Sequence, residues 1–237
     1  MMDHARDLAS VREATDRLLT AAAKLDNAAV AEPSRLPGWT RGHVLAHLAR
    51  NADALVNVLE GRPMYVSEGA RDADIERDAP RPLEVQLADV RQSANRFQDA
   101  ASVSADWSRV VELRNGVTDS ASRVPFRRWI EVEIHHVDLG IGYELEDLPE
   151  EFMQREINFL TERFRDHPGV PTLVIKQDDG RLIPTGAVRS VPPEQIESGH
   201  HLTVSGSRAD LLGWLAGRRD GSALRVDGGT LPALPPL

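Results

Sequence analysis

The stretch PFRRWIEVEIHHVDLG, residues 125–140, decides the fold of this chain. A helix over this stretch carries apolar residues on nearly every side: Phe126, Trp129, Ile130, Val132, Ile134 and Val137. Such a helix is buried, so other helices must surround it. Three earlier segments, 3–25, 40–61 and 82–97, repeat apolar residues every three or four positions, as amphipathic helices do. The sequence therefore predicts an N-terminal four-helix bundle.

The ends of these helices are marked by capping and breaking residues. Thr40 follows the breaker Pro37-Gly38 and is a predicted N-cap, and Gly61 ends the same helix. Pro82 suits the first position of a helix because its missing N–H costs nothing there. Between them, residues 62–80 are polar and longer than a usual helix connection. We expect this segment to be a long loop that covers a pocket.

One more amphipathic segment, residues 150–165, ends at His167-Pro168-Gly169, and the predicted secondary structure changes after it. Beyond it, residues 173–175 and 202–204 read as strands and 178–180 as a turn. Ser207 is a predicted N-cap for a short helix over 209–217, and the Pro-rich residues 231–237 form an extended tail. We expect an α+β protein: a helical bundle over 1–168 and a small α+β domain over 169–237.

The composition excludes several classes of protein. The 237 residues carry a net charge of -9, which argues against a nucleic-acid partner because phosphate binding needs clustered Lys and Arg. No apolar run approaches the roughly 20 residues that span a bilayer, and the N-terminal residues lack the pattern of a signal peptide. We therefore expect a cytoplasmic protein with no membrane partner. Cysteine is absent, so any metal site must use His and carboxylate ligands.

The central helix carries a candidate metal site. Glu131 and His135 are four residues apart, so their side chains lie on one face, about one turn from each other. His47 on the helix over 40–61 is a candidate third ligand, because side chains of facing helices converge inside a bundle. Two His and one carboxylate leave one coordination position open, which is typical of a catalytic zinc site. A plain hydrogen bond between Glu131 and His135 is the alternative.

Spacing alone does not choose among the possible pairs. Glu133 and His136 are also one turn apart, and so are His43 and His47. For His43 we expect a role in capping or in supporting a ligand, and for His136 a hydrogen bond to a neighbouring carboxylate. Asp138 would either orient a ligand imidazole or cap the end of its helix.

Four motifs together resemble one family. They are GWTRGHVLAH at 38–47, PMYVS at 63–67 followed by Ala70 and Arg71, EVEIHHVDLG at 131–140, and LAGR at 215–218. In this order they look like the mycothiol-dependent maleylpyruvate isomerases, which belong to the DinB-like metal enzymes. The resemblance covers both expected domains and implies a DinB-like bundle. The chain departs from the family pattern at Trp129 and Ile130, where a more polar, Arg-bearing sequence is common.

The resemblance implies a site and an activity. The family's metal ligands fall on His47, Glu131 and His135, and its C-terminal arginine falls on Arg218. The cofactors implied are Zn²⁺, or another divalent metal, and mycothiol, whose thiolate would occupy the open position. Reversible addition of that thiolate to the double bond would convert maleylpyruvate to fumarylpyruvate in aromatic, gentisate-type catabolism. Arg218 would stabilise the charge of the intermediate.

The sequence is also compatible with two other functions. The same activated thiol could be conjugated to an electrophile, which would make the chain a mycothiol S-transferase. The chain could also be a binding module without metal. In the isomerase reading the partners are a small-molecule substrate and a low-molecular-weight thiol, and the expected state is a monomer or a weak homo-oligomer.

Overall fold

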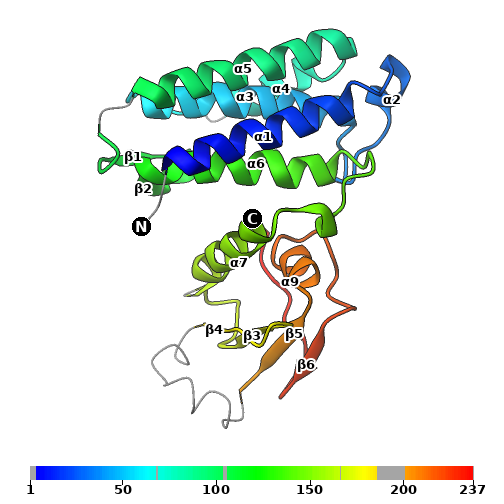
Figure 1. Ribbon diagram of the computed structural model, residues 1–237, viewed down its shortest axis with the longest axis vertical. Coiled ribbons are helices and arrows are strands. Elements are labelled where there is room, and N and C mark those ends of the chain that lie inside the picture. The colour runs from blue at the N-terminus through cyan, green and yellow to red at the C-terminus, as the bar shows by residue number, and fades with distance from the viewer. Residues whose placement is uncertain (1–3, 68, 104–105, 166, 186–200, 237) are drawn as a thin grey trace. The chain divides into compact units, whose positions relative to one another are not determined.

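The computed structural model describes residues 4–67, 69–103, 106–165, 167–185 and 201–236 (Figure 1). The chain forms two compact units, Met1–Tyr143 and Glu144–Leu237. The first is helical with one short hairpin, and the second combines helices with a four-stranded sheet. The predicted α+β class is thus confirmed. No helix of the described residues is both long enough and apolar enough to span a membrane.

Four helices build the first unit: α1 (His4–Ala22), α3 (Arg41–Leu59), α5 (Leu83–Val103) and α6 (Val124–Asp138). Each packs against two others, because α1 contacts α5 and α6, and α3 also contacts α5 and α6. Two short helices, α2 (Asn27–Ala31) and α4 (Ala70–Asp78), pack against α3. This arrangement places the inner faces of α3 and α6 against each other.

The helix that dominates the sequence is buried as predicted. Trp129, Val132 and Val137 of α6 are at most 3% exposed, and Gly140 ends the helix with a φ of 64° that favours glycine. Arg128 is also buried, at 1% exposure, and donates to the carbonyl of Leu48 at 2.9 Å and to Oδ1 of Asn51 at 2.7 Å. These bonds tie α6 to α3 and offset part of the cost of a charge inside the bundle.

The expectation of an unstructured loop over 62–80 is wrong, because this segment contains α4. Ile75 is 1% exposed and anchors the helix to the bundle. Asp78 is 4% exposed and is paired with Arg50, Arg77 and Arg81. With so few apolar residues, α4 has no periodicity that a sequence pattern could reveal, and ion pairs hold much of it in place.

A short antiparallel hairpin, absent from the sequence prediction, connects α5 to α6. Its strands are β1 (Val110–Glu112) and β2 (Thr118–Ser120), with Val111 paired with Asp119. The 3₁₀ turns η1 (Arg114–Gly116) and η2 (Ala121–Arg123) precede and follow β2. Asn115, in η1, has a φ of 59°, which asparagine tolerates better than most residues.

The second unit consists of η3 (Leu145–Asp147), two helices and one sheet. The helices are α7 (Glu150–Phe164) and α9 (Arg208–Leu215), and the strands are β3 (Val174–Gln177), β4 (Leu182–Pro184), β5 (Thr203–Gly206) and β6 (Arg225–Asp227). The sheet order is β4-β3-β5-β6, in which only β3 and β5 are parallel. Helix α9 packs on β3 and β5, and Ser207 caps it as predicted by accepting from the backbone of Asp210. Strands β4 and β6 were not predicted.

The two units divide earlier in the chain than the predicted boundary after Pro168. The division lies between Tyr143 and Glu144, so α7 belongs to the second unit. The physical reason is its packing: α7 contacts α9, and its apolar stripe, including Phe152, Ile157 and Leu160, is buried. A stop signal in the sequence marks the end of a helix, but it does not show which neighbour that helix packs against.

Candidate metal centre

Three side chains converge between α3 and α6. Nε2 of His47 lies 2.8 Å from Oε2 of Glu131, and Nε2 of His135 lies 3.3 Å from the same oxygen. The three ligand atoms all lie within 4.8 Å of one another, and no other such group of three occurs among the described residues. Ligands of a tetrahedral ion with bonds of about 2.0–2.1 Å are roughly 3.3 Å apart, so the spacing suits one ion.

The helices position these side chains in a simple way. Glu131 and His135 lie one turn apart on α6, and the packing of α3 against α6 brings His47 to the same point. The rings of His47 and His135 meet edge to face with centroids 4.5 Å apart. His47 is buried, whereas the side chains of Glu131 and His135 are 31% and 13% exposed. The cluster is therefore accessible from one side.

A buried carboxylate orients one of the imidazoles. Nδ1 of His135 lies 2.8 Å from Oδ2 of Asp138, which is 0% exposed. A carboxylate that accepts from Nδ1 selects the tautomer whose Nε2 is available for a metal. Of the two roles considered for Asp138, the structure favours orientation of a ligand over capping of the helix.

Two of the three groups in the cluster have the protonation state that a bound cation needs. Burial, together with the neighbouring His135, lowers the pKa of His47 to about 4. Burial would raise the pKa of Glu131, but hydrogen bonds from His135 and His47 outweigh it and hold that pKa well below its usual value. Burial likewise opposes the charge on His135, yet Asp138 and Glu131 raise its pKa. At neutral pH, His47 is therefore neutral and Glu131 is ionised, as metal ligands must be.

His43 is not part of the cluster. Its Nδ1 accepts from the backbone N–H of Thr40 at 3.2 Å, which completes a capping box at the start of α3. Its Nε2 lies 3.5 Å from Glu76 on α4. The expected capping role is confirmed, and the His43 and His47 pair is not a pair of ligands.

Glu133 and His136 likewise do not form a ligand pair. Glu133 is 0% exposed and accepts from Arg17, from Nε1 of Trp129 at 3.0 Å and from the hydroxyl of Tyr143 at 2.8 Å. His136 stacks on the ring of Tyr143 at 4.0 Å. Because Glu133 is two residues from Glu131, it points to the opposite side of α6. That side of the helix holds the bundle together.

Two residues near the cluster were not part of the predicted site. Nη2 of Arg71 lies 3.4 Å from Nδ1 of His47, and its guanidinium carbon lies 5.7 Å from the ring centroid of Trp39. Burial raises the pKa of Tyr65, and the nearby charge of Arg71 opposes this rise. Both residues lie in the segment that was expected to be a loop over a pocket, and both belong to the motif of residues 63–71 that contributes to the family resemblance.

Arg218 belongs to the second unit. It follows the end of α9 and donates to the carbonyl of Ala216 at 2.7 Å. A cation is favourable at that end of a helix because the last carbonyls have no partners within the helix. The catalytic role of Arg218 stays a prediction.

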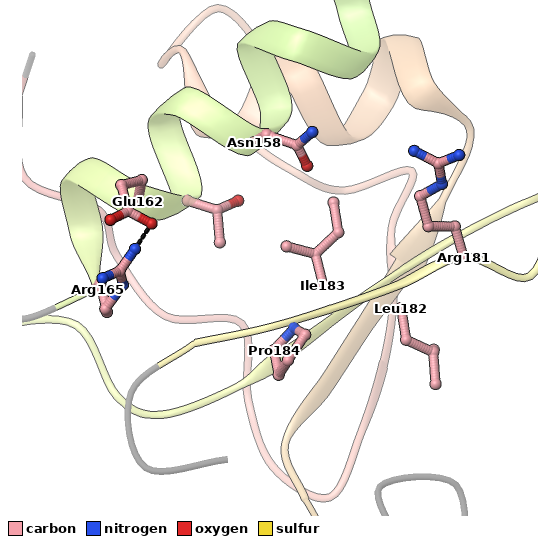
Figure 2. Close-up of a pocket in the computed structure, with 8 residues that line it drawn as sticks. Asn158, Glu162, Arg165, Arg181, Leu182, Ile183 and Pro184 are labelled. Carbon is pink, nitrogen blue, oxygen red and sulfur yellow. Dashed lines mark ion pairs between the residues drawn. The ribbon is translucent and has the colours of Figure 1, made fainter. Parts of the chain in front are cut away.

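The second unit also contains a cavity of about 330 Å³ (Figure 2). One wall is formed by Asn158 and Glu162 of α7 and by Arg165 directly after it, and the facing wall is Arg181 with strand β4. Arg165 forms an ion pair with Glu162, so the charges on the helical wall are paired with each other. The cavity contains no cluster of metal-ligand type.

Comparisons with known proteins agree with this geometry. The family model described as the mycothiol maleylpyruvate isomerase N-terminal domain matches residues 11–140, and that of the C-terminal domain matches residues 147–236. A crystal structure of the mycothiol-dependent maleylpyruvate isomerase is similar over 99% of this chain and 97% of that chain, with 28% identity and a TM-score of 0.85. A histidine-to-alanine mutant of that isomerase matches over the same shares, with 27% identity and the same TM-score. No curated protein sequence gives a significant match. Because the two models together cover nearly the whole chain, it belongs to the mycothiol maleylpyruvate isomerase family.

Proposed function

We propose that this chain is a metal-dependent and mycothiol-dependent isomerase that converts maleylpyruvate to fumarylpyruvate. The observation that carries the proposal is the convergence of His47, Glu131 and His135 between α3 and α6, in a chain of this family. Two imidazole nitrogens and one carboxylate oxygen suit zinc, although other divalent ions accept the same ligands. These three ligands would leave one coordination position open, as in a catalytic site rather than a structural one.

The ligand set fits such an ion on its own chemistry. Asp138 engages Nδ1 of His135, so Nε2 of this ring is the nitrogen left to bind. A bound divalent cation would favour the thiolate of mycothiol, whose reversible addition to the cis double bond allows rotation to the trans isomer. The chain itself contains no cysteine, so a thiol nucleophile must come from outside.

The chain must also stabilise the negative charge that develops on the substrate during the addition. Addition to a double bond conjugated with a carbonyl develops negative charge on oxygen, and a fixed guanidinium stabilises such charge. Arg218 is our candidate for this role, on the basis of its place in the LAGR motif at 215–218. Its planar fork would also bind a carboxylate of the substrate through two parallel hydrogen bonds.

Metal analysis and an isomerisation assay test the proposal together. The wild-type protein should hold about one equivalent of divalent metal and isomerise maleylpyruvate only when mycothiol is present. His47→Ala should lose metal and activity together, whereas His167→Ala, which alters an exposed histidine, should lose neither. A wild-type protein that holds less than about half an equivalent of metal after metal-replete purification would overturn the site.

The role of Arg218 and the alternative activity have separate tests. Arg218→Ala should keep the metal and lower kcat by about 100- to 1000-fold, as the loss of a group that stabilises an oxyanion does. Arg225→Ala, at an exposed arginine of the same unit, is the control and should have normal turnover. If mycothiol gives no rate with maleylpyruvate but is conjugated to an electrophile, the chain is a mycothiol S-transferase and the isomerase proposal is wrong.

A further inference from the structure

Arg71 occupies an unusual place for an arginine. It lies in the first turn of α4, which begins at Ala70. The N-terminus of a helix carries partial positive charge, so a cation there is unfavourable and an acidic residue is preferred. Helix stability therefore does not explain this residue, and its reason must be sought in what the guanidinium contacts.

The guanidinium lies beside the metal cluster. Its Nη2 is 3.4 Å from His47, and the group lies over the ring of Trp39, where cation–π attraction holds it. Tyr65 is close enough that the charge of Arg71 lowers the pKa of its hydroxyl against the effect of burial. The side chain is only 17% exposed, so the charge is partly removed from water while it lies next to His47.

The ion pair of Arg71 is weaker than that of Arg50 in the same unit. Its carboxylate partner is Asp72, the adjacent residue, whose side chain is 61% exposed. An ion pair with a largely exposed partner contributes little, so an incoming anion can replace that partner. By contrast, Arg50 reaches across the bundle from α3 to Asp89 on α5, at 2.7 Å. Arg71 can therefore give up Asp72 for an incoming carboxylate at small cost.

We propose that Arg71, held by Trp39 and Tyr65, binds a carboxylate of the substrate beside the metal cluster. This inference rests on the proposed function, because maleylpyruvate carries a carboxylate at each end. A guanidinium pairs with a carboxylate through two parallel hydrogen bonds, which positions the substrate as well as attracting it. Arg71 is then a binding residue for one end of a dicarboxylate, supplied by the same unit as the metal ligands.

The test compares two ligands that differ in one charge. Metal-loaded protein without thiol is titrated with maleate and with maleamate, in which one carboxylate is replaced by an amide. The wild-type protein should bind maleate about 10- to 100-fold more tightly, because a hydrogen bond to a charged partner is lost with the amide. Arg71→Gln should remove this preference, and Arg71→Lys should keep part of it, because lysine retains the charge without the fork.

Two controls separate this role from a general effect on charge or folding. Arg62→Gln makes the same change in net charge at a pair that is largely exposed, and it should keep the wild-type preference for maleate. Arg71→Gln should retain the wild-type metal content and thermal stability, since the residue does not support its helix. Loss of metal in this variant would overturn the inference, because Arg71 would then serve the metal cluster instead.

Turnover distinguishes this inference from the proposed function. With maleylpyruvate and mycothiol, Arg71→Gln should raise KM by about 10- to 100-fold with little change in kcat. A wild-type protein that isomerises, with an Arg71→Gln variant of unchanged KM, would overturn the inference and leave the function. A wild-type protein that does not isomerise, with a variant that loses the preference for maleate, would overturn the function and leave the carboxylate site.

Discussion

Replacement of Asp138 should weaken metal binding without unfolding the protein. This carboxylate is fully buried, and Nδ1 of His135 lies 2.8 Å from it. It therefore sets the orientation of the imidazole and leaves Nε2 as the nitrogen that faces the cluster. Asp138→Asn keeps the shape of the side chain and one acceptor oxygen, but removes the charge. Asp138→Ala removes the hydrogen bond altogether. The two variants should therefore form a graded series.

Two independent magnitudes agree on the size of the effect. Removal of a group that orients a metal-binding histidine costs about 10- to 100-fold in metal affinity. At about 1.4 kcal/mol for each tenfold, this range is roughly 1.4–2.8 kcal/mol. A hydrogen bond to a charged group contributes about 1.5–3 kcal/mol, which is the same range. We expect about tenfold weaker binding for Asp138→Asn and about 100-fold for Asp138→Ala.

The effect should also depend on pH, with a definite sign. Although burial lowers the pKa of His135, Asp138 and Glu131 raise it above its usual value in the metal-free protein. A metal ion must displace the proton on Nε2 of the imidazolium, and the charge of Asp138 at Nδ1 stabilises that doubly protonated ring. Without the charge on Asp138 that pKa falls, so the proton competes less in the variant. The deficit in affinity should be largest above the wild-type pKa of His135 and should shrink as the pH falls through it.

Competition with a chromogenic chelator measures the affinity of metal-free protein at pH values above and below that pKa. Asp119→Asn is the matched control. Asp119 lies in β2 and pairs with Arg127 of α6 at 2.6 Å, but it is not part of the cluster. It should leave the affinity for metal unchanged. A folded Asp138→Ala variant with wild-type affinity would refute the reasoning, and so would a deficit that grows as the pH falls.

Three further predictions follow from the same structure. His43→Ala should keep the metal and lower the free energy of unfolding by about 0.5–2 kcal/mol, because it loses part of a helix cap; loss of metal would return His43 to the ligand set. Glu133→Gln should lower that free energy by about 2–3 kcal/mol in urea denaturation, with unchanged metal content, because three donors lose a charged acceptor; a neutral result would contradict the buried network. In metal-free protein, the pKa of His47 is lowered from 6.5 to about 4. As the pH falls from 6.5 to 4, the unfolded chain therefore takes up a proton on His47 before the folded protein does, and the free energy of unfolding decreases. His47→Gln should flatten this dependence in urea titrations with a chelator present, and an unchanged slope would show that His47 is not its source.

Much of the helical architecture is predictable because it depends on local interactions. The apolar pattern of residues 125–140, the cap at Thr40 and the glycine at 140 each act within a turn or two of helix. The structure has a helix in each of the four segments expected to form the bundle. Helix α4 escaped prediction because Ile75 is its only buried apolar residue and ion pairs supply much of its attachment.

Elements that depend on distant partners were harder to predict. Strands β4 and β6 have three residues each and lie at the edges of the sheet, where they show no alternation that a pattern could detect. The affiliation of α7 depends on α9, which begins far along the chain. A short strand or an amphipathic helix acquires its place only from the surface that it covers, and that surface is formed by other segments.

The candidate site divides in the same way. By itself, the sequence determined that Glu131 and His135 share one face of a helix, since helical geometry fixes which residues are one turn apart. Only the tertiary structure brought His47 to that face, turned His43 into a cap and placed Asp138 behind His135. The physical reason is that the rotation of α3 against α6 is set by packing along their whole length, so no local spacing contains it.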